Sequence, residues 1–231
     1  DLYVKMDTLV GRVVDQLNPG DVLMVVSDHG FKPFKWGVNL NTWLWREGYL
    51  VLKDDAPADE PWFQNVDWDR TRAFAYGLTG IFLNLKGRER QGIVDSGNER
   101  LALQLEIKQK LEAYVDKARR QNPIRRCMLA QMTLKGPYVK EAPDLLIGYR
   151  VGYRASWNSA VGKITDQVIE PNTKSWSGDH AIDPQLVPGI FFSNWSVEER
   201  RPALADLGPT ILALFGLKKQ TFHDGKILNM T

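Results

Sequence analysis

Two of the three histidines stand next to an aspartate in a glycine-flanked loop beside an apolar run that is typical of a core strand. The first pair is Asp28–His29 in "DVLMVVSDHG", and the second is Asp179–His180 in "SWSGDHAID". An imidazole nitrogen combined with a carboxylate suits Zn²⁺, Mn²⁺ or Fe²⁺, whereas an all-oxygen ligand set suits Mg²⁺ or Ca²⁺. Alternatively, Asp28 and His29 form a turn in which the aspartate bonds its own backbone two residues on. The spacing leaves both interpretations open.

The apolar run before Asp28 predicts where the first pair lies. Valine-rich and bounded by "NPGD", it is typical of a strand covered on both faces, as in parallel sheets. In open α/β sheets, ligands bind just beyond the carboxyl ends of such strands, and Gly30 permits a sharp turn there. We expect "PDLLIG" and "VPGIFFSN" to join the same mostly parallel sheet, with helices on its faces. The expected fold class is therefore α/β.

Other patterns predict the elements around this sheet. Apolar residues at helical spacing predict a first helix that ends at Asn18-Pro19-Gly20. Further predictions are a short helix within 39–48, a strand over 49–52, a hairpin around 77–80 and a strand near 124–134. A last helix is expected over 206–217. An amphipathic helix is expected over about 98–120, with an apolar face that includes Leu101, Leu105, Ile107, Leu111 and Val115. Residues of about 70–135 are predicted to form an edge subdomain inserted into the core.

Composition excludes several classes of protein. Lys and Arg number 30 against 28 Asp and Glu in 231 residues, so the formal charge of +2 gives no case for a nucleic-acid partner. No apolar run approaches the roughly 18 to 20 residues that a membrane span needs. Cys127 is alone, which excludes an internal disulfide and favours a small buried hydrophobe. Neither compartment nor oligomeric state is predicted.

The first residues also lead to a prediction about which part of a domain this chain represents. The helix within the first 17 residues leads into a core strand without an earlier strand that could pair with it, whereas βαβ units need one. We therefore expect residues 1–231 to be the C-terminal part of one catalytic domain whose sheet is incomplete at its N-terminal side.

The order of several segments resembles a known family. "VVSDHGF", "LNTWLWREGYL", "IFLNLKGRERQGIV", "GPYVKEAPDLLIGYRVGYRASW", "WSGDHAIDPQLVPGIFFSN" and "LADLGPTILALFGL" together are similar to the C-terminal half of alkaline phosphatase superfamily proteins. The closest branch is the type I phosphodiesterase and nucleotide pyrophosphatase group. The resemblance covers nearly the whole chain. It implies an alkaline phosphatase-like three-layer sandwich and a metal-dependent hydrolase of small phosphate esters.

The resemblance also implies a two-metal site. Asp28 and His29 would be joint ligands of one metal and His180 a ligand of the other, with Zn²⁺ or Mn²⁺ as the ion. Because two such metals lie about 4 Å apart, we expect Asp28 and His180 to converge within about 10 Å. The nucleophilic Thr or Ser, an Asp and an Asp-x-x-x-His pair would lie upstream. No catalytic nucleophile is therefore expected in this chain, which alone would be inactive.

Four further residues leave alternatives open. Arg154 and Trp157 in "GYRASW" could bind substrate, the guanidinium on a phosphate and the indole against an organic group, or could be a surface arginine over a packed tryptophan. Asp179 and Asp183 could orient the His180 ring or cap a turn. Two other functions also stay open: transfer of a phosphoryl or phosphoethanolamine group by a transferase or mutase of the superfamily, and a non-catalytic binding domain.

Overall fold

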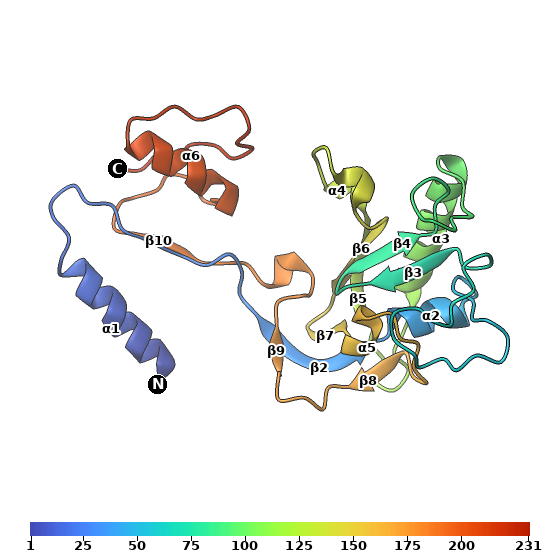
Figure 1. Ribbon diagram of the computed structural model, residues 1–231. Coiled ribbons are helices and arrows are strands. Elements are labelled where there is room, and N and C mark those ends of the chain that lie inside the picture. Colours follow the sequence, from blue (N-terminus) through green and yellow to red (C-terminus); the bar gives the residue numbers. More distant parts are fainter. The chain divides into compact units, whose positions relative to one another are not determined.

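The computed structural model describes all 231 residues and divides them into two compact units. Unit 1 consists of residues 1–30 and 188–231, and unit 2 consists of residues 31–187. Figure 1 shows the elements of both. Asp28 and His29 therefore belong to unit 1, and His180, Arg154 and Trp157 to unit 2.

Unit 1 contains a two-stranded sheet and two helices. Its elements are α1 (Leu2–Val14), β1 (Met24–Val26), β10 (Phe191–Ser193) and α6 (Leu204–Leu214). β1 and β10 pair antiparallel with Val25 opposite Phe192. The predicted strand before Asp28 exists, but Val26 is 43% exposed. Within residues 1–231, the expectation that both faces of this strand are covered is therefore not met.

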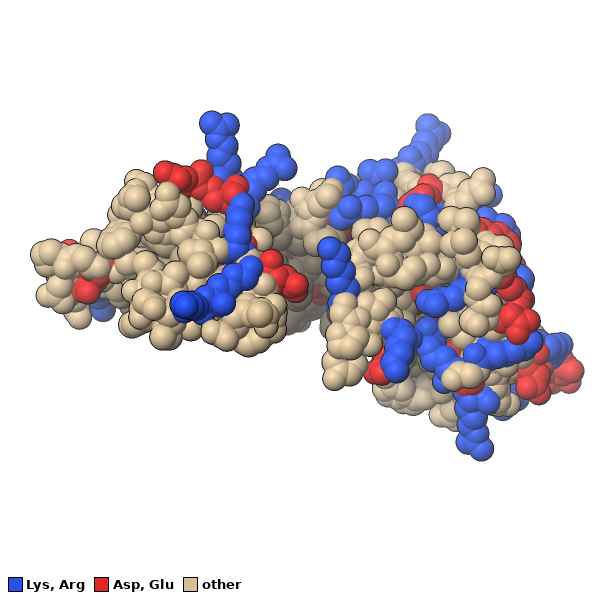
Figure 2. Space-filling view, turned by 90° about the horizontal axis from the view of Figure 1, so that it is seen from above, with Lys and Arg blue, Asp and Glu red and all other residues tan.

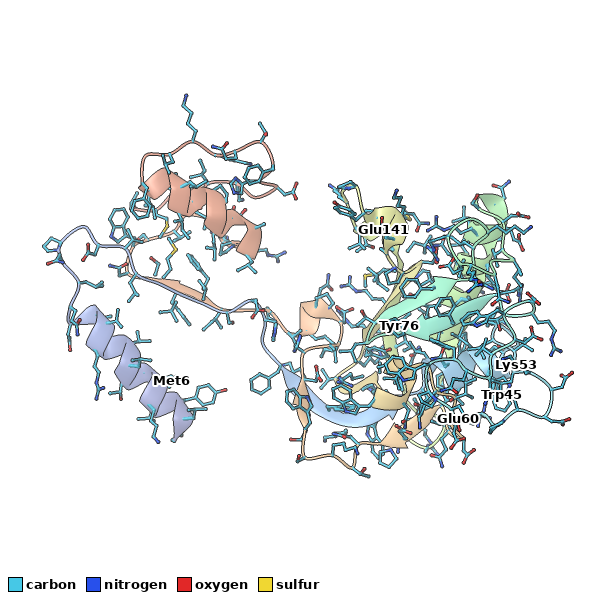
Figure 3. The ribbon with its side chains drawn as sticks, viewed as in Figure 1. Met6, Trp45, Lys53, Glu60, Tyr76 and Glu141 are labelled. Atoms are coloured by element: carbon cyan, nitrogen blue, oxygen red, sulfur yellow. The ribbon has the colours of Figure 1, made fainter.

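Apolar side chains of unit 1 are largely exposed. α1 begins at a cap in which Asp1 accepts a hydrogen bond from the backbone of Tyr3, and it buries none of its residues. Met6 on this helix is labelled in Figure 3 and is 47% exposed. Leu228 is the one buried apolar residue of the unit. The hydrophobic core of the protein therefore lies elsewhere.

Unit 2 holds two four-stranded sheets. The first has the order β7-β2-β8 with β9 also on β2, and its strands are β2 (Lys32–Val38), β7 (Gly152–Ala155), β8 (Ile169–Pro171) and β9 (Gly178–Asp179). The second has the order β3-β4-β6-β5, with β3 (Ala73–Tyr76), β4 (Gly80–Leu83), β5 (Ile124–Leu129) and β6 (Leu145–Tyr149). β2 and β7 form the single parallel pair, and every other pairing is antiparallel.

The helices of unit 2 pack on these sheets. They are α2 (Leu40–Arg46), α3 (Asn98–Ala113), α4 (Ala130–Thr133) and α5 (Trp157–Ala160), with short 3₁₀ turns η1 (Val139–Glu141) and η2 (Pro184–Leu186). α2 contacts β3, and α3 contacts β5. The fully buried side chains of Leu44, Ile107, Ile147 and Tyr149 belong to one core cluster that joins these elements. Cys127 is buried in the same cluster, and burial raises the pKa of its thiol to about 12.

The α/β class is confirmed, but the expectation of one mostly parallel sheet is wrong. β6 carries the "PDLLIG" segment and lies in a different sheet from β1 and β10. Short connections explain part of the difference, since β3 and β4 are joined by three residues and a parallel pair needs a crossover of about a dozen or more. An apolar run also carries no information on strand direction. The three-layer sandwich and its incompleteness stay predictions.

Most other elements lie where the sequence predicts them. The first helix, the short helix at 40–46, the hairpin and the last helix are confirmed. The helix expected over 98–120 ends at Ala113, because Asp116 forms a turn in which its carboxylate accepts from the Ala118 amide at 3.1 Å. Of its expected apolar face, Leu101 and Leu105 are exposed. The single catalytic domain and the inserted subdomain over about 70–135 stay predictions.

The distribution of charged side chains and the apolarity of the helices are relevant to possible partners. On the face of unit 2 visible in Figure 2, basic and acidic side chains are interspersed with uncharged ones, in keeping with the net charge of +2. None of the helices combines the length and the apolarity that crossing a bilayer requires.

Candidate functional site

The Asp28–His29 loop is fixed by close backbone contacts with residues 189–190. The Ser27 amide donates to the Ile190 carbonyl at 3.1 Å, and the Ile190 amide donates to the Ser27 hydroxyl at 3.0 Å. A Cβ on Gly189 would lie 2.1 Å from the Ser27 carbonyl oxygen, so only glycine permits this approach. The end of β1 is thereby held against the residues that precede β10.

The two side chains of this loop lie close together. His29 Nδ1 lies 2.8 Å from the Gly30 carbonyl oxygen, which can only accept, so this nitrogen carries the proton. His29 Nε2 is 3.6 Å from Asp28 Oδ2. Two ligands of one tetrahedral Zn²⁺, each at about 2.0–2.2 Å, lie about 3.4 Å apart. Nε2 and Oδ2 therefore fit a shared metal ion.

The same loop contains a local turn bond. The Asp28 carboxylate accepts from the His29 amide at 3.0 Å, one residue on rather than two. This bond uses Oδ1, whereas Oδ2 faces the imidazole. The turn and the ligand pair are thus compatible, because each uses a different carboxylate oxygen.

Asp28 also lines a cavity of unit 1 with a volume of about 430 Å³. Most of its lining residues are apolar and come from β1, from β10 and the start of α6, and from the segments just before these two elements, and Arg200 and Arg201 add two cationic side chains. A cavity with this charge suits an anionic group.

The His180 loop is positioned by a buried carboxylate. β9 pairs with β2 so that Asp179 is opposite Lys32, and Asp179 is only 7% exposed. Its Oδ1 accepts from the amides of His180 and Ala181 at 2.7 and 2.9 Å. Its Oδ2 accepts from the indole N–H of Trp176 at 3.1 Å and lies 2.6 Å from Arg154 Nε. Burial alone would raise the pKa of Asp179, but these hydrogen bonds and the Arg154 charge outweigh it and lower that pKa.

A second buried carboxylate holds the other end of the loop. Asp183 has no exposed surface and accepts from Arg126 at 2.5 and 2.9 Å. It also caps η2 by accepting from the Gln185 amide at 2.9 Å. Between these two anchors, the His180 side chain is 53% exposed. The loop is therefore held rigidly at the backbone while its imidazole reaches the surface.

Arg154 is buried behind Trp157. Its guanidinium carbon lies 4.0 Å from the Trp157 ring centre and 4.7 Å from that of Phe34, and the residue is 1% exposed. Trp157 is 46% exposed and lines a cavity of about 350 Å³. The order is the reverse of a surface arginine over a packed tryptophan: the indole faces the cavity, and the guanidinium faces Asp179.

The predicted ligands do not form a complete metal cluster. Neither unit brings together three or more His, Cys, Asp or Glu side chains in a metal-holding group. The convergence of Asp28 with His180 concerns two separate units and stays a prediction. Trp176 was not predicted as a partner of Asp179, although its position three residues earlier is a local signal. The Arg154–Asp179 pair was not predicted either, and the sequence carries no local signal for it.

A two-ligand loop and a histidine oriented by a carboxylate are features of metal-dependent hydrolases. A family model described as type I phosphodiesterase / nucleotide pyrophosphatase matches residues 1–181. The chain therefore belongs to this family of phosphodiesterase-type hydrolases, which generally use divalent metals and act on phosphate esters. No curated protein and no solved structure matches the chain.

Proposed function

We propose that this protein is the metal-binding C-terminal portion of a hydrolase that cleaves small phosphodiesters. Membership of the type I phosphodiesterase family carries this proposal. The spacing of His29 Nε2 and Asp28 Oδ2, 3.6 Å, supports it, since that distance suits two ligands of one ion.

Asp28 and His29 hold one divalent metal, and His180 is a ligand of a second, with Zn²⁺ or Mn²⁺ as the ion. Imidazole nitrogen and carboxylate oxygen suit these ions better than Mg²⁺ or Ca²⁺. When bound, the metals stabilise the negative charge that develops during phosphoryl transfer. The protein presents the His29 imidazole through Nε2 because the Gly30 carbonyl occupies Nδ1.

Each unit contains a cavity whose lining suits a chemical group present in phosphate esters. In unit 2, the half-exposed indole of Trp157 offers a flat apolar wall for an organic group. Arg200 and Arg201 place positive charge in the cavity that Asp28 lines, which favours an anionic phosphate. Arg154 supports Trp157 from behind, since it lies under the ring with almost no exposed surface.

The nucleophile and the remaining metal ligands lie upstream of residue 1 in the same catalytic domain. The exposed apolar surface of unit 1 supports this, because extended apolar faces are normally covered by protein. Its members are in α1, in or next to β1 and β10, and in the segment after α6: Leu2, Tyr3, Val4, Met6, Leu9, Val26, Ile190, Phe192, Phe215 and Phe222. The upstream half of the domain is the covering that we propose.

The full-length parent tests this function. We expect hydrolysis of bis-p-nitrophenyl phosphate that requires Zn²⁺ or Mn²⁺ and is lost on chelation. His180→Ala should abolish it, whereas His223→Ala, which removes the one histidine outside both loops, should retain it. The 231-residue chain alone should give no turnover. Full activity of the His180→Ala parent would contradict the metal assignment, and chelator-sensitive turnover by the chain alone would contradict an upstream nucleophile.

The same assay separates hydrolysis from transfer. A phosphoryl or phosphoethanolamine transferase would form product only when an alcohol or sugar acceptor is added. Product formation in water alone supports the hydrolase.

A further inference from the structure

The buried ion pair between Arg154 and Asp179 lies next to the imidazole of His180. Resting on the proposed role of His180 as a metal ligand, we propose that Asp179, held by Arg154, is a positioning residue that keeps the proton of His180 on Nδ1. The nitrogen presented to a metal is then Nε2.

The carboxylate faces one ring nitrogen of His180. Asp179 Oδ1 lies 3.7 Å from His180 Nδ1. This distance exceeds a hydrogen bond, but it is short enough for the charge of the carboxylate to act on the ring nitrogen. An ionised carboxylate can only accept, so an N–H at Nδ1 is attracted and a lone pair there is repelled. The field of Asp179 therefore selects the Nδ1–H tautomer.

The carboxylate cannot turn away from the ring. Its Oδ1 is fixed by the amides of His180 and Ala181, and its Oδ2 by Arg154 and Trp176. Arg154 is itself clamped between the rings of Phe34 and Trp157 and donates to the Ala155 carbonyl at 2.6 Å. Three hydrogen-bond donors and the charge of Arg154 thus hold one carboxylate in a single orientation, which is how outer partners of metal-binding histidines set ring orientation.

The two histidine loops reach the same imidazole state by different means. His29 Nδ1 is 2.8 Å from a backbone carbonyl, that of Gly30. His180 depends on a side chain 3.7 Å away. Substitution of Asp179 should therefore change the tautomer of His180 and leave that of His29 unchanged, which makes His29 an internal control.

The test is a long-range ¹H–¹⁵N spectrum of the metal-free 231-residue chain at about pH 9, where an ordinary imidazole is neutral. The three histidines are assigned by single His→Gln substitutions. In the wild-type chain, His180 should show a protonated Nδ1 and an unprotonated Nε2, whereas exposed imidazoles ordinarily favour a protonated Nε2. A protonated Nε2 on His180 in the wild-type chain overturns the proposal without any variant.

Variants then identify the responsible group. Asp179→Asn should lower the ratio of the Nδ1–H to the Nε2–H tautomer of His180 by about fivefold or more. Asp116→Asn is the matched control, because it removes a buried carboxylate of unit 2 that pairs with Arg119 at 2.7 Å, far along the chain from the loop. It should leave the ratio unchanged. An unchanged ratio in a folded Asp179→Asn chain contradicts the proposal.

A milder variant covers the case in which Asp179→Asn does not fold. Trp176→Phe removes one donor to Asp179 Oδ2, and the residue is 59% exposed, so folding should persist. The ratio should then fall by a smaller factor than in Asp179→Asn. Because no metal is present, the proposed hydrolase activity can fail while the tautomer result stands, and the reverse also holds.

Discussion

The two histidine loops differ in what holds them. In unit 2, Asp179 and Asp183 are buried carboxylates that bind arginines from distant strands and fix the backbone on both sides of His180. In unit 1, the Asp28 side chain is 69% exposed, and its contacts are with its immediate neighbour. A loop built by tertiary ion pairs keeps its shape without a ligand. In the Asp28–His29 loop the backbone is held by the contacts of Ser27 with Ile190, whereas the exposed Asp28 side chain would gain its final order from a bound metal.

The first prediction concerns the anchors and has the largest expected effect. Asp183→Ala should destabilise unit 2 by about 3–5 kcal/mol, because it leaves the Arg126 guanidinium partly buried without its partner. Asp28→Ala should leave the stability unchanged, since that side chain is exposed. Urea unfolding followed by tryptophan fluorescence reports on unit 2, because all tryptophans except Trp195 lie in it. Equal midpoints for the two variants would remove the contrast between the loops.

The second prediction compares apolar packing in the two units. Leu44 in α2 has no exposed surface, so Leu44→Ala should cost about 2–5 kcal/mol from lost burial and the cavity left behind. Leu9 in α1 is 53% exposed. Leu9→Ala should therefore change stability by less than about 0.5 kcal/mol. The measurement is chemical unfolding monitored by circular dichroism, and a large loss in Leu9→Ala would show that α1 is packed.

The two loops also show which contacts can be predicted from the sequence alone. Asp28 and His29 are neighbours in the chain, and their pairing needs nothing but local geometry, so residue spacing was enough to propose it. For Arg154 the sequence left open a phosphate contact or a surface position over a tryptophan, and it did not indicate the buried contact with Asp179, 25 residues later. The partner of a long side chain depends on which strands lie together, and the sequence does not state this.

For the fold, as for the two loops, local features were predictable from the sequence and tertiary pairing was not. Helices and the hairpin follow from local periodicity and turn residues, and these predictions are confirmed in α1, α2, β3–β4 and α6. Strand direction depends on tertiary pairing, so the parallel sheet was wrong. The end of α3 was missed because Asp116 competes for backbone amides with its own carboxylate, a local bond that apolar spacing does not reveal.

The third prediction is that the isolated chain binds Zn²⁺ weakly through unit 1. His29→Ala should weaken this binding by about tenfold or more, because one of two ligands is lost. His180→Ala should leave it unchanged, since His180 lies in the other unit. Calorimetric titration of the metal-free chain provides the measurement. Equal losses in the two variants would show that a single ion uses both loops.

The last prediction concerns acid and the α6 helix of unit 1, and its expected effect is the smallest. Asp206 accepts from the amides of Ala203 and Lys226 at 2.9 and 2.8 Å, and these two hydrogen bonds lower the pKa of its carboxyl group. The unfolded chain then binds the proton more readily than the folded chain, so stability from this group rises with pH. It is fully present above the ordinary aspartate pKa of about 3.9 and is lost as pH falls through the lower folded value. Amide-exchange protection of residues 204–214, measured relative to unstructured peptides, should therefore decline below about pH 4. In Asp206→Asn, protection should be lower at neutral pH and should lack this decline, and an unaltered pH dependence in that variant would assign the effect to another carboxylate.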